Sequence, residues 1–192
     1  MTETSMREDQ GTVDLVPDPA DDPQAPADAR IALLSDTHFP QRGRRLSAEV
    51  RAHLADATAI VHAGDLCDLE ALEELRAVGP PVHVVLGNND DELEARLPEQ
   101  ESVTIAGVRI GIVHDAGPRN GRLARLRRRF PDHDVVVFGH SHIPLHEQDD
   151  DGFQIVNPGS ATDHRGRWPV HTVGELRVRD GAATFALIDL PT

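Results

Sequence analysis

From residue 30 onwards, short apolar runs alternate with stretches in which apolar side chains recur every three or four residues. The short runs, which predict β-strands, cover residues 30–36, 58–65, 81–90, 134–142, 153–160, 170–180 and 182–190. The periodic stretches, which predict helices, cover residues 46–57, 68–79 and 120–130. This alternation is typical of an α/β fold that contains parallel strands.

Local signals add detail to this pattern. Residues 101–115 predict a hairpin that turns at Ala106 and Gly107. Asp68 is expected to cap the start of the helix in residues 68–79, and Gly79 is expected to stop it.

Residues 1–29 have a different composition from the rest of the chain. They carry eight acidic side chains, one basic side chain and four prolines. Such a segment buries too little apolar surface to order itself. We therefore predict a disordered, acidic, proline-rich arm in residues 1–29 and a single domain in residues 30–192.

The overall composition narrows the function classes. The formal net charge of −14 argues against a stable nucleic-acid complex, because a negative field repels phosphate backbones. The only cysteine, Cys67, excludes an internal disulfide and fits a reducing compartment. No signal segment or membrane span is evident. We expect a cytoplasmic protein that does not bind membranes, either monomeric or a homo-oligomer.

Side chains that commonly bind metals follow the ends of five predicted strands. They are Asp36, His38, Asp65, Asn88, His114, His140 and His142. Parallel strands end at one edge of a sheet, so these side chains are expected to converge there. In extended chain, residues i and i+2 project to the same side. Asp36 and His38 are therefore expected to share one ion, and a slight bend would direct His140 and His142 towards two adjacent ions.

The types of these side chains also indicate which ions would bind. Imidazole, carboxylate and amide groups without a thiolate suit manganese, iron, zinc or nickel. Gly64, Gly87 and Gly139 each precede one of the predicted ligands. A residue without a Cβ lets the backbone turn sharply and approach a cluster closely. The sequence thus predicts a metal site surrounded by tight loops.

The motifs "DTH", "GD", "GNND", "H" and "GHSH", in this order, resemble those of the calcineurin-like metallophosphoesterases. The short spacing and the motif "VNPGS" resemble the small bacterial and archaeal phosphodiesterase branch, which lacks a capping domain. The resemblance implies a four-layer α/β/β/α sandwich with two facing mixed β-sheets. It also implies two divalent ions, with Mn²⁺ expected and Ni²⁺, Fe²⁺ or Zn²⁺ as alternatives.

The resemblance assigns the ligands of the two ions. Asp36, His38 and His142 are expected to hold the first ion. Asn88, His114 and His140 are expected to hold the second, with Asp65 bridging both. The implied reaction is hydrolysis of a small phosphodiester by in-line attack of a hydroxide that bridges the ions. Asp65, Asn88, His114 and Asn89 are the expected catalytic residues.

Asn89 departs from the pattern of many relatives, which have a histidine there that acts near the leaving group. An amide cannot usefully donate a proton, so general-acid assistance is lost at this position. Asp90 is expected either to support its neighbour or to cap a helix. Arg165 or Arg167 is expected to contact the substrate phosphate, and Asn89 is a further candidate substrate residue. A phosphomonoesterase and a catalytically weak scaffold of the same fold are the alternative functions.

Overall fold

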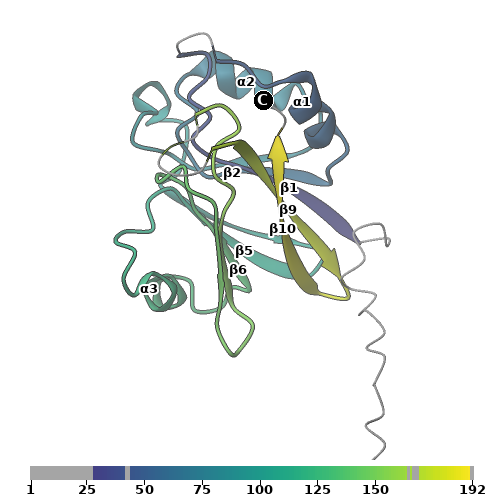
Figure 1. The fold of residues 1–192 in the computed structure, drawn as a ribbon, viewed down its shortest axis with the longest axis vertical. Helices are drawn as coiled ribbons and strands as arrows, with labels where there is room; N and C mark the ends of the chain where they lie inside the picture. The colour runs from purple at the N-terminus through teal and green to yellow at the C-terminus, as the bar shows by residue number, and fades with distance from the viewer. Residues whose placement is uncertain (1–27, 42–43, 164, 166–168, 191–192) are drawn as a thin grey trace, which may run out of the picture.

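In the part of the chain that the structure describes, two five-stranded β-sheets pack face to face, with helices on their outer faces (Figure 1). The structure is a computed structural model that describes residues 28–41, 44–163, 165 and 169–190. The predicted acidic arm therefore lies outside the described residues, except for Asp28 and Ala29. Within the described part of the chain, no helix is long and apolar enough to span a membrane.

The first sheet has the strand order β10-β9-β1-β2-β3. Its strands are β1 (Ala29–Leu34), β2 (Ala59–His62), β3 (Val82–Val84), β9 (His171–Arg179) and β10 (Ala182–Leu190). β2 is parallel to both β1 and β3, whereas β9 pairs antiparallel with both β1 and β10. This sheet is therefore mixed, as the family resemblance implies.

The second sheet is also mixed and has the order β4-β5-β6-β8-β7. Its strands are β4 (Gln100–Ile105), β5 (Val108–Val113), β6 (Val135–Val137), β7 (Leu145–Gln148) and β8 (Gln154–Asn157). β5, β6 and β8 run parallel, and β4 and β7 are antiparallel edge strands. The hairpin turn is confirmed, because Ala106 and Gly107 both have positive φ. β7 was not predicted, because its four residues alternate in burial and include three polar side chains.

Among the described residues, three α-helical segments complete the outer layers. α1 (Ala48–Ala55) and α2 (Leu69–Arg76) lie on one side of the sandwich and α3 (Arg122–Arg129) on the other (Figure 1). A short 3-10 helix, η3 (Asp91–Leu93), follows β3. The Asp68 carboxylate caps α2 by accepting the N–H of Ala71 at 2.9 Å, as predicted. Gly79 lies in the turn after α2, with a φ of 123°.

Apolar side chains fill the spaces between these four layers. On β1, Ala32 and Leu34 pack towards α1 and α2, whereas Ile31 and Leu33 face the second sheet. A third cluster, which includes Leu126 of α3, lies between that helix and the second sheet. The sequence of β1 is apolar from Ile31 to Leu34 because both faces of this strand are covered by other layers.

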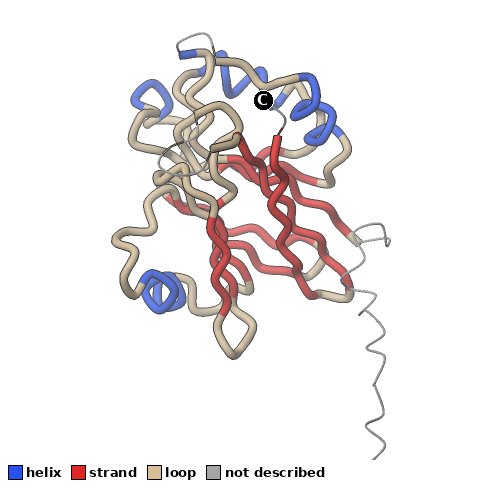
Figure 2. Tube along the Cα trace, in the orientation of Figure 1, coloured by secondary structure: helices blue, strands red, loops and turns tan. Residues whose placement is uncertain are grey.

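The loops that leave β1, β2, β3, β5 and β6 crowd together at one end of the sandwich, as the loop-coloured trace shows (Figure 2). Backbone hydrogen bonds join them: the Asp36 N–H donates to the Gly64 carbonyl, and the Gly139 N–H donates to the His114 carbonyl, both at 3.0 Å. The predicted convergence of polar strand ends therefore occurs, and it draws on both sheets.

Candidate metal centre

The first group of side chains at this end of the sandwich contains Asp36, His38 and His142. The Nε2 atoms of the two histidines lie 3.3 Å apart. The Nε2 of His142 is also 3.4 Å from the Asp36 Oδ1. All three side chains are buried. One ligand atom from each lies within 4.8 Å of the others, so the three could hold one cation together.

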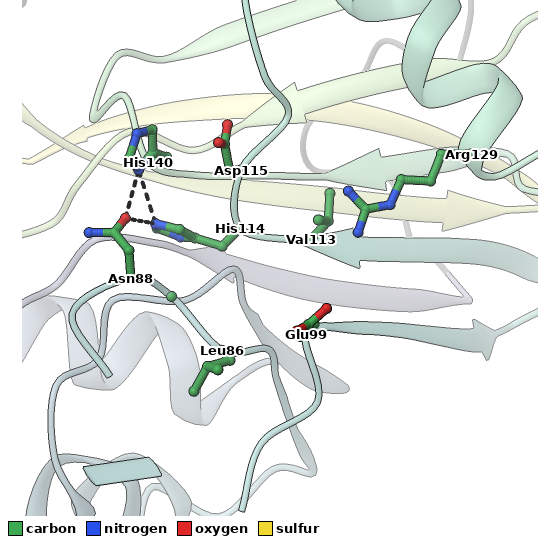
Figure 3. A pocket seen from close by; sticks show the side chains of 9 residues that line it. Leu86, Asn88, Glu99, Val113, His114, Asp115, Arg129 and His140 are labelled. Atoms are coloured by element: carbon green, nitrogen blue, oxygen red, sulfur yellow. Dashed lines mark hydrogen bonds between the residues drawn. The ribbon is translucent and has the colours of Figure 1, made fainter. Parts of the chain in front are cut away.

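The second group contains Asn88, His114 and His140, which face one another in Figure 3. The Asn88 Oδ1 lies 3.0 Å from the His114 Nε2 and 2.8 Å from the His140 Nδ1. The two ring nitrogens are 3.3 Å apart. An amide oxygen and two imidazole nitrogens therefore point at one place, as ligands of a single cation do.

Asp65 lies between the two groups, and each of its oxygens faces one of them. Its Oδ2 is 3.5 Å from the His38 Nε2, and its Oδ1 is 3.5 Å from the His114 Nε2. A carboxylate in this position could contact two neighbouring cations at once. The side chain is 2% exposed, so protein groups rather than bulk water set its environment.

Hydrogen bonds on the opposite side of the rings orient two of the histidines. The His114 Nδ1 lies 2.7 Å from the Ala63 carbonyl oxygen. The His142 Nδ1 makes a very short contact with the Asp163 carbonyl oxygen. Because a carbonyl only accepts, each Nδ1 carries the proton and each Nε2 presents its lone pair to the site. This is the usual arrangement around metal-binding histidines.

The electrostatics of Asp36 test whether a cation fits here. Its Oδ2 is buried and has no hydrogen-bond partner among the described residues. Burial, and then the nearby charge of Asp65, raise the pKa of Asp36 to about 8. An unpaired buried carboxylate is costly, and a divalent cation would supply the missing partner. The residues present therefore fit a metal ion.

The histidine pKa values agree with a ligand role. Burial lowers the pKa of His142 to about 4, and it also lowers the pKa of His38. Both rings are therefore neutral near pH 7, which is the form that binds metals. Burial alone would raise the pKa of Asp65, but His114 and the N–H donors of Asn89 hold it below its usual range.

Backbone strain is concentrated at the predicted ligands. The φ angles of Asp36, His38, Asp65, His140 and His142 lie between 47° and 68°. Non-glycine residues occupy this left-handed region only when the surrounding structure holds them there, typically at functional sites. The expectation that extended chain places Asp36 and His38 on one side is therefore wrong. Their two left-handed backbones bring them together instead.

The three glycines that precede predicted ligands are needed for close approach, as the sequence suggested. A Cβ on Gly64 would lie 2.7 Å from the His114 Nδ1. A Cβ on Gly139 would lie 2.8 Å from the Asp36 Oδ2. On Gly87, a Cβ would overlap the Asp65 backbone nitrogen. The loops of the site are thus packed too tightly for side chains at these positions.

The Asp90 side chain holds two loops of the site together, a role that the sequence did not specify. Its buried carboxylate accepts the N–H groups of Asp65, Cys67 and Gly87, at 2.9, 2.6 and 2.7 Å. Asp90 stands at the N-cap position of η3, as one of the two alternatives expected, but its side chain makes no capping hydrogen bond there. Its neighbour Asn89 donates its backbone N–H to Asp65 Oδ1 at 2.9 Å and its side-chain amide to Oδ2 at 2.7 Å.

The loop after β8, in which the "VNPGS" motif ends, is hydrogen-bonded to the first group of ligands. The Ser160 hydroxyl donates to the Asp36 carbonyl at 2.7 Å and accepts the Asp163 N–H at 2.9 Å. The Asp163 carboxylate pairs with Arg44 at 2.7 Å and with Arg165 at 3.4 Å. Arg165 therefore contacts this loop, and Arg167 lies outside the described residues. Sequence reasoning missed Asp163, which belongs to no recognisable ligand motif.

Comparisons with known proteins agree with this geometry. A model of the calcineurin-like phosphoesterase superfamily domain matches residues 30–181. A protein of Methanocaldococcus jannaschii named "probable metallophosphoesterase" is 33% identical over 153 residues, which make up 78% of this chain and 76% of that protein.

Solved structures with the same fold include Vps29 of Entamoeba histolytica in complex with Zn²⁺. It is 26% identical, with a TM-score of 0.66, and the match covers 83% of this chain and 98% of Vps29. An archaeal phosphodiesterase is 20% identical, with a TM-score of 0.63 and coverage of 84% and 99%, and it shows the shared fold alone.

Proposed function

Because this chain belongs to the calcineurin-like phosphoesterase superfamily, we propose that it is a phosphodiesterase that works with two divalent cations. The observation that carries the proposal is the position of Asp65, with one oxygen facing His38 and the other facing His114. A site for a single ion would not need a carboxylate shared in this way. Mn²⁺ is the proposed ion, with Ni²⁺, Fe²⁺ and Zn²⁺ as alternatives.

When bound, two cations would neutralise charge on a phosphate ester and lower the pKa of a water molecule nearby. The protein's own contribution is to hold the ligands in place. Asn89 fixes both oxygens of Asp65, and Ala63 fixes the ring of His114. Asp36 and Asp65 bring fewer charges than two divalent cations would, so a site that held both cations would attract phosphate although the chain is acidic.

The surroundings of the second group favour a diester over a monoester. A pocket of about 300 Å³ opens beside His114 and His140, which leaves room for a second ester substituent. Glu99 and Asp115 also line this pocket. Their negative charges act more strongly against a monoester, which carries almost two charges at neutral pH, than against a diester, which carries one.

Comparing two aryl phosphates tests this function. Protein loaded with Mn²⁺ is expected to hydrolyse bis(p-nitrophenyl) phosphate faster than p-nitrophenyl phosphate. Asp65→Ala and His140→Ala should each lose at least about a hundredfold in kcat, because each removes a proposed ligand. His83→Ala is the matched control, since His83 pairs with Glu101 away from the site. Equal rates in all four proteins would refute the proposal.

A scaffold role is the second candidate, because a Vps29 structure shares this fold and binds Zn²⁺ without being named an enzyme. In the present chain all seven proposed ligand positions carry metal-binding side chains, which favours catalysis. Metal analysis combined with the aryl phosphate assay separates the two. A protein that hydrolyses neither ester, whether or not it binds metal tightly, would be a scaffold. We also propose a cytoplasmic location, in keeping with the single free Cys67.

A further inference from the structure

The pocket beside the second group of ligands continues away from the metal centre to the end of α3. Asn88, His114 and His140 line one end of it, and Arg129 lines the other (Figure 3). Leu86 and Val113 form apolar parts of its wall. A substrate whose phosphate lies at the metal centre could therefore place its second substituent in this pocket.

Arg129 presents unused hydrogen-bond donors to the pocket. Its Nε donates to the Gln100 Oε1 at 2.8 Å, which fixes the direction of the guanidinium. Within the described residues, its two terminal NH2 groups have no hydrogen-bond or ion-pair partner. A guanidinium held at Nε can still donate to two oxygens of a carboxylate or a similar group.

Two carboxylates line the same pocket without pairing with Arg129. Asp115 follows His114 directly, and its Oδ1 accepts the Gly117 N–H at 2.6 Å. Glu99 lies next to Gln100 in the chain, on the opposite wall from Asp115 (Figure 3). Among the described residues, no salt bridge joins Arg129 to either one. Both signs of charge are therefore available to a ligand in this pocket.

We propose that this pocket selects phosphodiesters whose second substituent is zwitterionic, as in an amino acid, with its carboxylate on Arg129 and its ammonium group between Glu99 and Asp115. The inference rests on the proposed function and specifies its substrate class. A substituent with only a negative charge would meet two carboxylates, and one with only a positive charge would meet Arg129. Opposite charges on one substituent complement all three side chains.

Four 4-nitrophenyl phosphodiesters test this selection. Their second substituents are L-serine (both charges), 2-carboxyethyl (negative), 2-aminoethyl (positive) and 2-methoxyethyl (uncharged), and 4-nitrophenolate leaves from all of them. The expected order of kcat/KM places the serine ester first, about three- to tenfold above the methoxyethyl ester, mainly through a lower KM. This modest range is expected because Glu99, Asp115 and Arg129 are all exposed, and exposed charge pairs contribute little.

Single substitutions test which side chain binds each charged group of the substrate. Arg129→Ala should remove the advantage of the serine ester, lower kcat/KM for the carboxyethyl ester and raise it for the aminoethyl ester, which no longer meets a like charge. Glu99→Gln should weaken the serine and aminoethyl esters only. Arg128→Ala is the matched control, because Arg128 is an exposed neighbour on the same helix and does not line the pocket. Equal kcat/KM for the four esters, or an equal loss for all of them in Arg129→Ala, would overturn the inference.

A binding measurement separates this inference from the proposed catalysis. In 4-nitrobenzylphosphonate esters of the same four alcohols, a CH2 group replaces the leaving oxygen, so they cannot be hydrolysed there. Calorimetric titration of the Mn²⁺-loaded protein should give the lowest Kd for the serine ester. If that order appears without turnover of the phosphodiesters, the pocket assignment stands and the proposed activity fails. If turnover occurs but the four Kd values are equal, the pocket assignment fails alone.

Discussion

The backbone carbonyl of Asp163 accepts the Nδ1–H of His142, so the Nε2 of this histidine faces Asp36 and His38. The carboxylate of the same aspartate pairs with Arg44 at 2.7 Å. One residue that is no metal ligand therefore links two loops and sets the direction of a proposed ligand. Loss of a direct partner of a metal-binding histidine typically lowers metal affinity by about 10–100-fold.

Asp163→Ala is expected to weaken Mn²⁺ binding by about three- to tenfold, less than the loss of a direct partner, because the carbonyl remains while its loop loosens. Competition with a chromophoric chelator measures the affinity. Asp150→Ala, an exposed aspartate between β7 and β8, is the control. Unchanged affinity in Asp163→Ala would mean that the Arg44 contact does not hold the loop.

Metal binding is expected to release protons at pH 7. The pKa of Asp36 is about 8 without a cation, because burial and the charge of Asp65 disfavour its ionised form. Most of the metal-free protein therefore carries a proton on Asp36 at pH 7, and a cation requires the carboxylate. Calorimetry in buffers of different ionisation enthalpy should detect about one proton released at pH 7 and far fewer at pH 9. Equal release at both values would contradict the raised pKa.

His62 gives a separate acid dependence of stability. It is fully buried beside the Thr37 hydroxyl, at 2.9 Å, and burial lowers its pKa to about 3. The unfolded chain binds a proton near pH 6.5 and the folded protein does not, so the free energy of unfolding falls as the pH drops below 6.5. The loss from this group approaches about 1.4 kcal/mol per pH unit. Urea unfolding of His62→Leu should show a correspondingly weaker dependence between pH 6.5 and 5.

Gly87→Ala tests the close packing under Asp65. Its Cβ would overlap the Asp65 backbone nitrogen, and backbone atoms cannot move aside as a flexible side chain can. We expect a loss of about 1–3 kcal/mol in the free energy of unfolding, together with weaker metal binding. Gly79→Ala is the comparison, since a Cβ there meets no atom within 4 Å and only its positive φ is unfavourable. Unfolding by urea and metal titration would detect both effects, and a Gly87→Ala protein with normal metal binding would rule out this packing argument.

Local patterns in the sequence predicted the α/β class and the seven proposed ligands, whereas the four-layer sandwich was predicted from the family resemblance. Covered strands such as β1 are mostly apolar, here without interruption from Ile31 to Leu34, and ligand-type side chains follow soon after the strand ends. The left-handed backbones of Asp36 and His38 could not be predicted, because non-glycine residues adopt them only under tertiary contacts.

The roles of Asp90 and Asp163 were also inaccessible from the sequence. Asp90 accepts N–H groups from the loops after β2 and β3, and Asp163 meets Arg44 more than a hundred residues earlier in the chain. Neither contact leaves a local signal. The sequence likewise could not predict that Arg129 and Glu99 line one pocket, because this depends on the packing of α3 beside β4.

Asp36, Asp65 and Asn88 extend from the first sheet, whereas His114, His140 and His142 extend from the second. Neither half of the sandwich holds a complete ligand set. A bound cation would therefore link the two sheets, and metal uptake would indicate that the sheets have packed together. The complete ligand set could assemble only after the two sheets had packed together, and removing the cation would weaken the contact between them.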